Sequence, residues 1–142
     1  MKRTSKLLAI AMVLVLSVSL FASCGGGTDI DLDKVNFNKI DLTITDTDFD
    51  KMEELLGEMD TAKFDRNVIK ITGENATRSS NCSIMIKNGE GVGRGISWEV
   101  IDGKFPDSYP ADGAKVTITG VLVKDSNGAR VLKVPADKVE TK

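Results

Sequence analysis

The sequence predicts a mainly β protein, a small five-stranded barrel with one N-terminal amphipathic helix, placed behind a signal peptide. The observations that predict it are an apolar N-terminal run, one segment of helical period, and several short alternating segments separated by turn residues. The chain has 142 residues, enough for one domain, with 19 Lys and Arg against 21 Asp and Glu. It has no His and only two Cys. A Ser-His-Asp triad, a His-ligated metal site and a disulfide-dense scaffold are therefore excluded.

Residues 1–23 have the layout of a secretory signal peptide. Lys2, Arg3 and Lys6 form a basic segment, and the apolar run that follows is interrupted only by two serines. This run of about 16 residues is shorter than the roughly 20 that a membrane-spanning helix needs. The tetrapeptide from Phe21 to Cys24, Phe-Ala-Ser-Cys, resembles the bacterial lipobox, with Phe where Leu is usual. That resemblance implies cleavage before Cys24 and a diacylglycerol on its sulfur.

We expect lipidation at Cys24 to anchor the protein at the outer, extracytoplasmic face of the cell membrane. Residues 24–34 are rich in Gly and Asp and have the composition of a flexible tether. The alternative is an ordinary signal peptide that happens to end near a cysteine. Cys24 could then form a disulfide with Cys82, whereas a lipidated Cys24 leaves Cys82 without a disulfide partner.

The net charge of the mature chain indicates which classes of partner to expect. Removal of the signal peptide takes away three basic residues and no acidic ones, which leaves 16 basic and 21 acidic residues and a net charge of −5. A nucleic-acid partner would favour a basic surface, so none is expected. Adhesion to anionic lipid is disfavoured for the same reason, and we expect the lipid anchor to hold the protein at the membrane.

The expected barrel domain covers residues 35–142 and begins with a short strand and a helix. Ile40, Leu42 and Ile44 alternate with polar residues, which is the period of a half-buried strand. Apolar residues at helical spacing then predict an amphipathic helix at about 47–59, with charged side chains on its other face. Several Asp and Thr residues just before it are N-cap candidates.

Five further segments have the alternation and β-branched residues of strands. They are expected at residues 68–71, 82–87, 96–101, 115–123 and 129–134. Residues 75–81, 88–91 and 102–114 have the composition of loops, and Asp125–Gly128 is a strong hairpin signal. Gly120 inside a strand predicts a bulge or bend. A closed barrel suits these strands better than an open sheet, because closure removes exposed strand edges.

Several stretches carry a family resemblance. They are Asp41-Leu42-Thr43 with the following helix, Phe64 to Gly73, Arg94 to Val100, Tyr109-Pro110, and Lys115 to Val121. Together they cover about residues 40–137 and resemble a family of small bacterial lipoproteins, of the Gram-positive type, with an OB-like barrel. The resemblance implies an OB-like barrel and a lipid anchor, and it implies no activity. Such proteins often carry adjacent cysteines where this chain has Gly89 to Arg94, so no metal or redox role of that pair is carried over.

Three residues are candidates for ligand binding: Arg94, Trp98 and Glu99. Trp98 could stack on a sugar or a base, as OB-type surfaces allow, but it shares strand parity with Ile96 and Val100, so core packing is the alternative. Glu99 is an acid inside an expected strand, with no partner that can be named for acid–base catalysis. Arg94 ends a glycine-rich stretch that precedes a strand rather than a helix, which leaves at most a weak anion site.

Cys82 could be a reactive thiol, although its parity with neighbouring isoleucines favours the core. Asp29, Asp31 and Asp33, and likewise residues 46–50, are spaced like the start of a calcium loop. Both sets lack the Gly and Glu that such a loop requires, so no metal is expected.

We therefore expect a non-catalytic binding module without cofactor that takes an unknown small ligand. The alternative is an assembly lipoprotein that docks on an envelope protein through a sheet edge or the helix face. An exposed apolar patch would favour that alternative, and a uniformly charged surface would weaken it.

Overall fold

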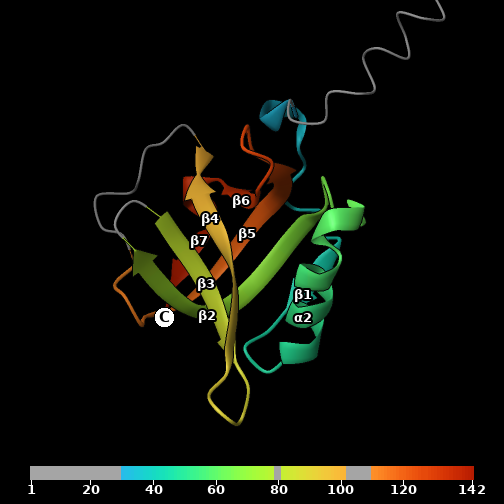
Figure 1. Cartoon of the computed structure of the whole chain (residues 1–142). Helices are drawn as coiled ribbons and strands as arrows, with labels where there is room; N and C mark the ends of the chain where they lie inside the picture. Colours follow the sequence, from blue (N-terminus) through green and yellow to red (C-terminus); the bar gives the residue numbers. More distant parts are fainter. Residues whose placement is uncertain (1–29, 79–80, 102–109) are drawn as a thin grey trace, which may run out of the picture.

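The computed structural model describes residues 30–78, 81–101 and 110–142 (Figure 1). The signal peptide and Cys24 lie outside these residues, as do residues 102–109 of one expected loop. The described part is a closed five-stranded barrel with one α-helix, which confirms the expected fold class. The barrel strands are β2 (Val68–Arg78), β3 (Asn81–Lys87), β4 (Gly93–Val100), β5 (Lys115–Lys124) and β6 (Arg130–Val134).

Shorter elements surround the barrel. Two three-residue strands, β1 (Leu42–Ile44) and β7 (Val139–Thr141), extend the sheet at its two ends. The helix α2 (Phe49–Gly57) follows β1. Three 3₁₀ turns complete the described elements: η1 (Leu32–Lys34), η2 (Met59–Thr61) and η4 (Ala136–Lys138).

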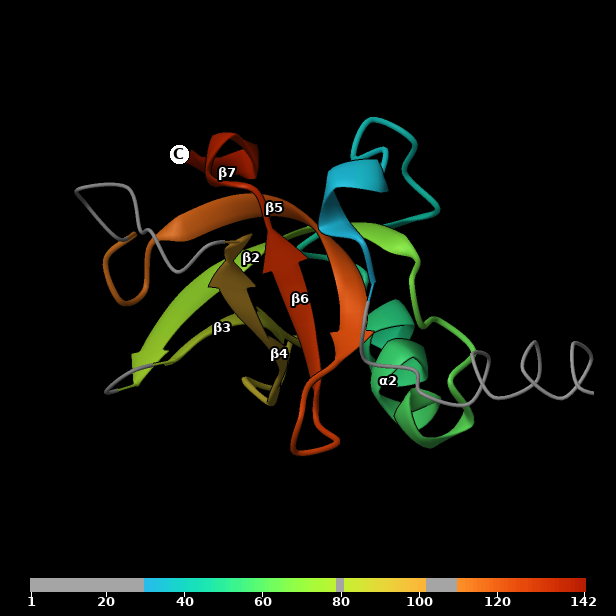
Figure 2. The ribbon, with the colours of Figure 1, turned by 90° about the horizontal axis from the view of Figure 1, so that it is seen from above.

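The strand order is that of a Greek-key barrel. Strands β2, β3 and β4 follow one another as antiparallel neighbours, and β5 returns to lie beside β2, with Ile71 opposite Ile118. β6 closes the barrel, because it pairs antiparallel to β5 and parallel to β4, with Trp98 opposite Leu132. Figure 2 shows the curvature of β2 and β5 around the interior. This is the OB-like architecture that the sequence predicts.

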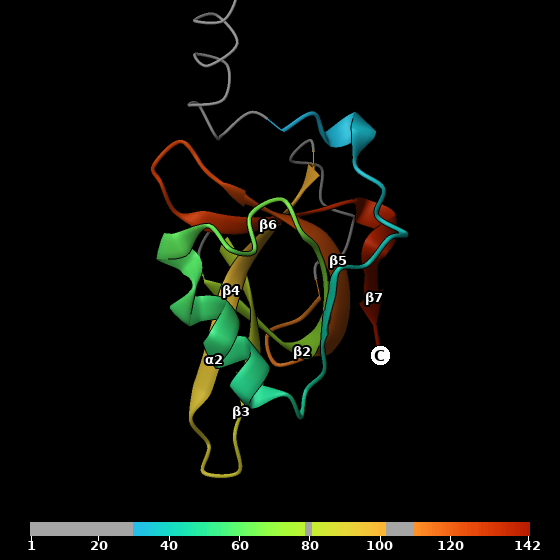
Figure 3. The same cartoon turned by 90° about the vertical axis from the view of Figure 1, so that its right-hand side faces the viewer.

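Helix α2 lies near the point where the neighbour of β2 changes from β1 to β3. The first half of β2 pairs with β1 and its second half with β3, and both neighbours lie on the same edge of β2. Met52 and Leu55 of α2 are fully buried in the barrel core, and the helix lies against β3 and β4 (Figure 3). The backbone N–H and the hydroxyl of Thr45 both donate to the Asp48 carboxylate, at 2.9 and 2.8 Å, and this turn starts the helix. The helix is shorter than expected and continues only as η2.

Two apolar clusters hold the structure together. The main core fills the barrel with side chains from β1, α2 and all five barrel strands, and Ile118 and Leu132 are among its fully buried members. The second cluster lies outside the barrel, where Ile30, Leu32, Val35 and Phe37 pack against Val121, Val123 and Val131. Eight consecutive residues of β5 are buried. One face of the strand lies in the barrel core, and the N-terminal segment covers Val121 and Val123 on the other face, while β7 and η4 lie beside the first half of the strand.

The structure corrects two sequence predictions. Residues 75–81 are not one loop, because β2 runs on to Arg78 and β3 begins at Asn81. The polar residue Asn75 is only 1% exposed, and its amide donates to the Pro110 carbonyl at 2.8 Å, so its burial is partly compensated. Strand β7 was not predicted at all, since three residues are too few to show a period. Ile30 and Leu32, which lie within the range assigned to the tether, pack against the barrel.

Candidate functional site

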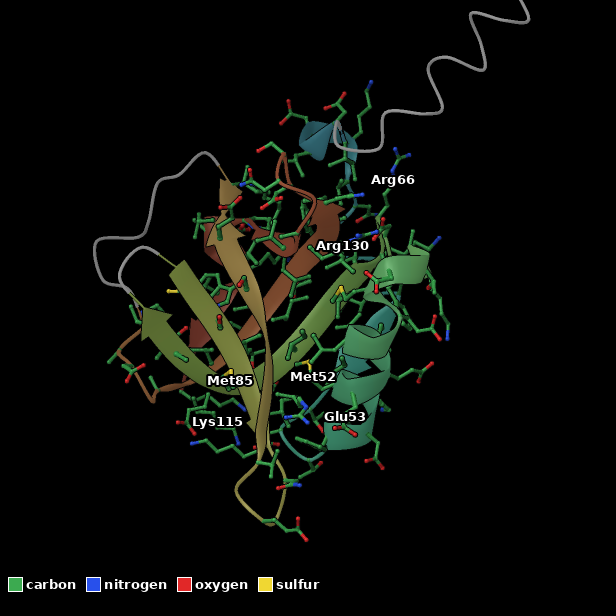
Figure 4. All side chains as sticks on the ribbon, viewed as in Figure 1. Met52, Glu53, Arg66, Met85, Lys115 and Arg130 are labelled. Carbon is green, nitrogen blue, oxygen red and sulfur yellow. The ribbon has the colours of Figure 1, made fainter. Side chains whose placement is uncertain are left out.

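A groove on the outer surface of the barrel is the first candidate site. It has a volume of about 210 Å³ and is lined by Asp46, Gly73, Glu74, Met85, Ile86, Lys87, Gly113 and Lys115. We call it the ion-pair groove. These residues come from β2, β3, the start of β5, and the turn after β1. Figure 4 shows Met85 and Lys115 at the end of the barrel opposite the N-terminal segment.

The groove exists because strands cross closely beneath it. A Cβ atom on Gly73 would lie 2.5 Å from the Met85 carbonyl oxygen, so only glycine allows β2 to cross β3 at this point. The pairing of β2 with β3 begins one residue later, at Glu74 opposite Met85, and continues to Arg78 opposite Asn81. The Met85 side chain lies over Gly95 of β4, where a Cβ atom would overlap its sulfur. The missing side chains of Gly73 and Gly95 therefore leave room for the Met85 backbone and side chain beside the groove.

Two ion pairs flank the ion-pair groove. The Lys87 ammonium donates to both carboxylate oxygens of Glu74, at 2.9 and 2.8 Å, and the Lys115 ammonium pairs with the Asp46 carboxylate. The hydrogen bond from Lys115, with its positive charge, holds the pKa of Asp46 below its usual value. All four side chains are about half exposed. Exposed pairs contribute only about 0.2–1 kcal/mol each, so a ligand can separate them at little cost.

A second groove lies at the other end of the barrel. Its volume is about 460 Å³, and it is lined by Ile30, Leu32, Glu99, Val123, Lys124, Asp125, Ser126 and Lys133. We call it the hairpin groove, because the turn between β5 and β6 forms one side. Glu99 and Lys133 are opposite one another on β4 and β6 and form an ion pair. Burial lowers the pKa of Lys133.

The three residues proposed for ligand binding do not come together. Trp98 is 2% exposed and belongs to the main core, so it offers no stacking surface and the packing alternative holds. Glu99 points to the opposite face of β4 and lines the hairpin groove. Arg94 lies toward the other end of the strand, where its Nε atom is 3.4 Å from the Glu53 carboxylate and its guanidinium is 6.0 Å from the ring centre of Phe49. Arg94 thus fastens α2 to β4.

Cys82 is a buried core residue rather than an exposed thiol. It lies on β3 opposite Thr77 of β2 and Trp98 of β4. Burial raises the pKa of its thiol, and hydrogen bonds from Thr77 and Asn75 offset only part of that effect. A thiol that stays protonated is a poor nucleophile, so the structure gives Cys82 a packing role.

The structure describes both acidic sets that are spaced like calcium loops, except for Asp29, which lies outside the described residues. Within the described ranges, no three Asp, Glu or Cys side chains are arranged to hold a metal ion. Asp46 pairs with Lys115, and Asp48 accepts hydrogen bonds from Thr45.

Helices within residues 30–78, 81–101 and 110–142 are all too short or too polar to cross a bilayer.

The members of the ion-pair groove could not be identified from the sequence. Its four charged residues come from four segments of the chain and meet because β2 pairs with β1, β3 and β5. They are Asp46, Glu74, Lys87 and Lys115. Each looks like an ordinary solvated charge in the sequence. The one available signal was Gly73 at the end of a β-branched run, which indicates a close approach of the backbone.

Comparisons with known proteins show little similarity. No family model and no curated protein matches the chain. Among solved structures, one from Leishmania major Friedlin described as a "putative aspartyl-tRNA synthetase" is similar over 88% of this chain and 25% of that chain. The identity is 10% and the TM-score is 0.40. Similarity at this level carries no argument about what the protein binds or does.

Proposed function

We propose that the protein is a non-catalytic extracytoplasmic binding domain, held at the outer face of the cell membrane by a lipid on Cys24. We further propose that its ion-pair groove takes a small ligand that carries both a positive and a negative charge. The observation that carries this proposal is the pair of lysines and pair of carboxylates around one groove on a closed barrel. An anchor and a rigid scaffold suit a module that captures a ligand near the membrane.

Charge and size narrow the class of ligand. A ligand ammonium can replace a lysine beside Asp46 or Glu74, and a ligand carboxylate or phosphate can replace an acid beside Lys87 or Lys115. The volume of 210 Å³ is below the range of about 300–1,000 Å³ that holds drug-sized molecules. A free amino acid, a dipeptide or phosphoethanolamine fits this description. Because the groups are half exposed, binding should weaken as salt rises.

The ionisation of Asp46 disfavours a role as general acid. A general acid needs a pKa near the working pH, whereas the lowered pKa of Asp46 keeps its carboxylate ionised at neutral pH. Glu74 is held by two hydrogen bonds from Lys87. Fixed charges of this kind attract and orient a ligand.

The alternative of docking on an envelope protein has less support. Among the described residues, the large apolar side chains that are exposed are Ile40 and Val92, at 40% and 41%, in two different loops. They form no contiguous patch that a protein partner could cover. The outermost strands, β1 and β7, have three residues each, so the edges offered for strand addition are short.

The ligand proposal is tested by titrating the lipidated protein in detergent micelles with L-alanine, D-alanyl-D-alanine and phosphoethanolamine, followed by amide NMR. At least one of these probes should shift amides around Glu74, Lys87 and Lys115. Lys87→Met should abolish the shifts. Lys39→Met, which removes an exposed lysine outside the groove, should leave them unchanged. If no probe shifts these amides in the wild-type protein or in Lys39→Met, the groove is not a site for such ligands.

The anchor is tested separately by mass spectrometry of the protein purified from membranes of a bacterial host. The expected mass is that of the chain beginning at Cys24 plus a diacylglycerol. Cys24→Ser should remove the lipid and release the protein from the membrane fraction. An unmodified Cys24 in the wild-type protein would refute the anchor without affecting the groove.

A further inference from the structure

The position of the N-terminal segment determines which end of the barrel meets the membrane. We propose that the end formed by residues 30–37 and the β5–β6 turn, residues 125–128, faces the bilayer surface. The ion-pair groove then faces away from it. This inference rests on the proposed lipid at Cys24, and it adds an orientation that the anchor alone does not require.

The N-terminal segment is packed on the barrel rather than loosely attached. Ile30, Leu32, Val35 and Phe37 cover Val121, Val123 and Val131 of β5 and β6. The segment has its own turn at η1, where the N–H of Val35 donates to the Leu32 carbonyl at 3.2 Å. Farther on, the Lys138 ammonium donates to the Asn38 side chain at 2.9 Å. Ile30, the first described residue, is therefore held at a fixed point on the barrel surface.

The distance from that point to the lipid is short. Residues 25–29 separate Cys24 from Ile30, and even fully extended they span only about 20 Å. Strand β4, with eight residues at about 3.3 Å each, spans about 25 Å. The tether is thus shorter than the barrel strands, and a barrel anchored at Ile30 cannot turn over freely against a flat surface.

The two ends of the barrel are well separated. The packed N-terminal segment and the β5–β6 turn lie at the top of the molecule, and the β3–β4 turn lies at the bottom (Figures 1 and 3). Met85 and Lys115 of the ion-pair groove lie in the lower half (Figure 4). The short tether therefore places the groove on the side from which a ligand in solution or in the envelope arrives.

The surface charge of this end does not oppose the orientation that the tether favours. The membrane-facing end carries Asp31, Asp33 and Asp125 beside Lys34, Arg66 and Lys124, a balanced mixture without a basic patch (Figure 4). Such a surface is neither drawn strongly to anionic lipid nor repelled from it. We therefore expect the orientation to be insensitive to salt, unlike adhesion through charge.

Energy transfer between two labelled positions and the bilayer tests the orientation. Ser126→Cys places a dye on the β5–β6 turn and Gly89→Cys places one on the β3–β4 turn. Both positions are exposed, and a Cβ atom on Gly89 meets nothing within 4 Å. The lipidated full-length proteins are reconstituted in phosphatidylcholine vesicles whose headgroups carry an acceptor dye. The buried Cys82 should label slowly, which the unsubstituted protein verifies.

The expected result is severalfold higher transfer from position 126 than from position 89, at both low and high salt. Equal transfer, or higher transfer from position 89, in protein that floats with the vesicles would overturn the orientation alone. Protein that does not float with the vesicles would overturn the anchor, and the orientation with it.

A second variant tests whether the packed segment sets the orientation. Leu32→Asp should detach the N-terminal segment and lengthen the free tether, so the difference between the two positions should shrink. Asp33→Asn changes an exposed neighbour and should preserve the difference. An unchanged difference in Leu32→Asp, in protein with a wild-type circular dichroism spectrum, would show that the packing does not orient the barrel.

Discussion

The two apolar clusters of this protein differ in how they are enclosed. The main core is surrounded by five paired strands and covered by α2, whereas the second cluster lies on the outside of β5 and β6 under a segment with a single 3₁₀ turn. Loss of packing in the first removes the barrel. Loss of packing in the second releases a chain that the barrel does not need for closure. The first cluster thus determines the fold, and the second determines where the N-terminal segment is held on the barrel.

Matched leucine truncations give the largest expected contrast. Leu132→Ala empties a fully buried site in the main core and should lower the free energy of unfolding by about 3–4 kcal/mol. Leu32→Ala removes a half-buried side chain from the second cluster and should cost about 1 kcal/mol. Urea unfolding followed by tryptophan fluorescence measures both. Equal losses would mean that the two clusters form one cooperative core.

The next contrast concerns the backbone approach between β5 and β6. A Cβ atom on Gly120 would lie 2.8 Å from both the Lys133 carbonyl oxygen and a methyl carbon of Val134. Gly120→Ala should therefore destabilise the barrel by about 1–3 kcal/mol, through forced movement of β6. Gly89→Ala, in open space, is the matched control and should be nearly neutral. A neutral Gly120→Ala in thermal unfolding would show that the two strands can separate locally.

A smaller effect is expected from the ion pair that joins the hairpin to the start of β2. Arg130 donates from Nε and Nη2 to the two carboxylate oxygens of Asp65, both at 3.1 Å, and its side chain is 11% exposed. Asp65→Asn should destabilise less than Gly120→Ala but more than Glu74→Gln, which removes a half-exposed pair. Urea unfolding of the three variants establishes the order. A larger effect from Glu74→Gln would give the ion-pair groove a structural role.

The smallest expected effect depends on pH. Hydrogen bonds from Thr45 lower the pKa of Asp48 below the ordinary value of 3.8. The stabilisation is therefore complete well above that value and is lost as the pH falls through the lower pKa of the folded state. Asp48→Asn should destabilise the protein at pH 7 and much less at pH 2–3. Asp137→Asn, at an exposed site, is the control. A pH-independent loss would assign the effect to the geometry of the Thr45–Asp48 turn rather than to the charge of the carboxylate.

The barrel strands could be predicted because their inward and outward residues alternate clearly. β3, β4 and β6 differ from the expected ranges by only a few residues. The second half of β2 could not be predicted, since Asn75 looks like a loop residue until Pro110 supplies an acceptor for its amide. The candidate site was even harder to predict from the sequence. Arg94, Trp98 and Glu99 share one strand but face three different environments, and the groove charges meet only through long-range pairing.

Strand β5 has a consequence for the order in which the molecule can form. It pairs with β2, β6 and β7, and Ile118 meets a partner, Ile71, that precedes it by 47 positions. A chain that emerges N-terminus first exposes β2 well before β5, the strand that covers its second edge. Closure thus waits for the last fifth of the sequence, from Lys115 on, and contacts of such separation are slow to form. Until β5 arrives, the earlier strands present an open sheet edge that can pair with other chains.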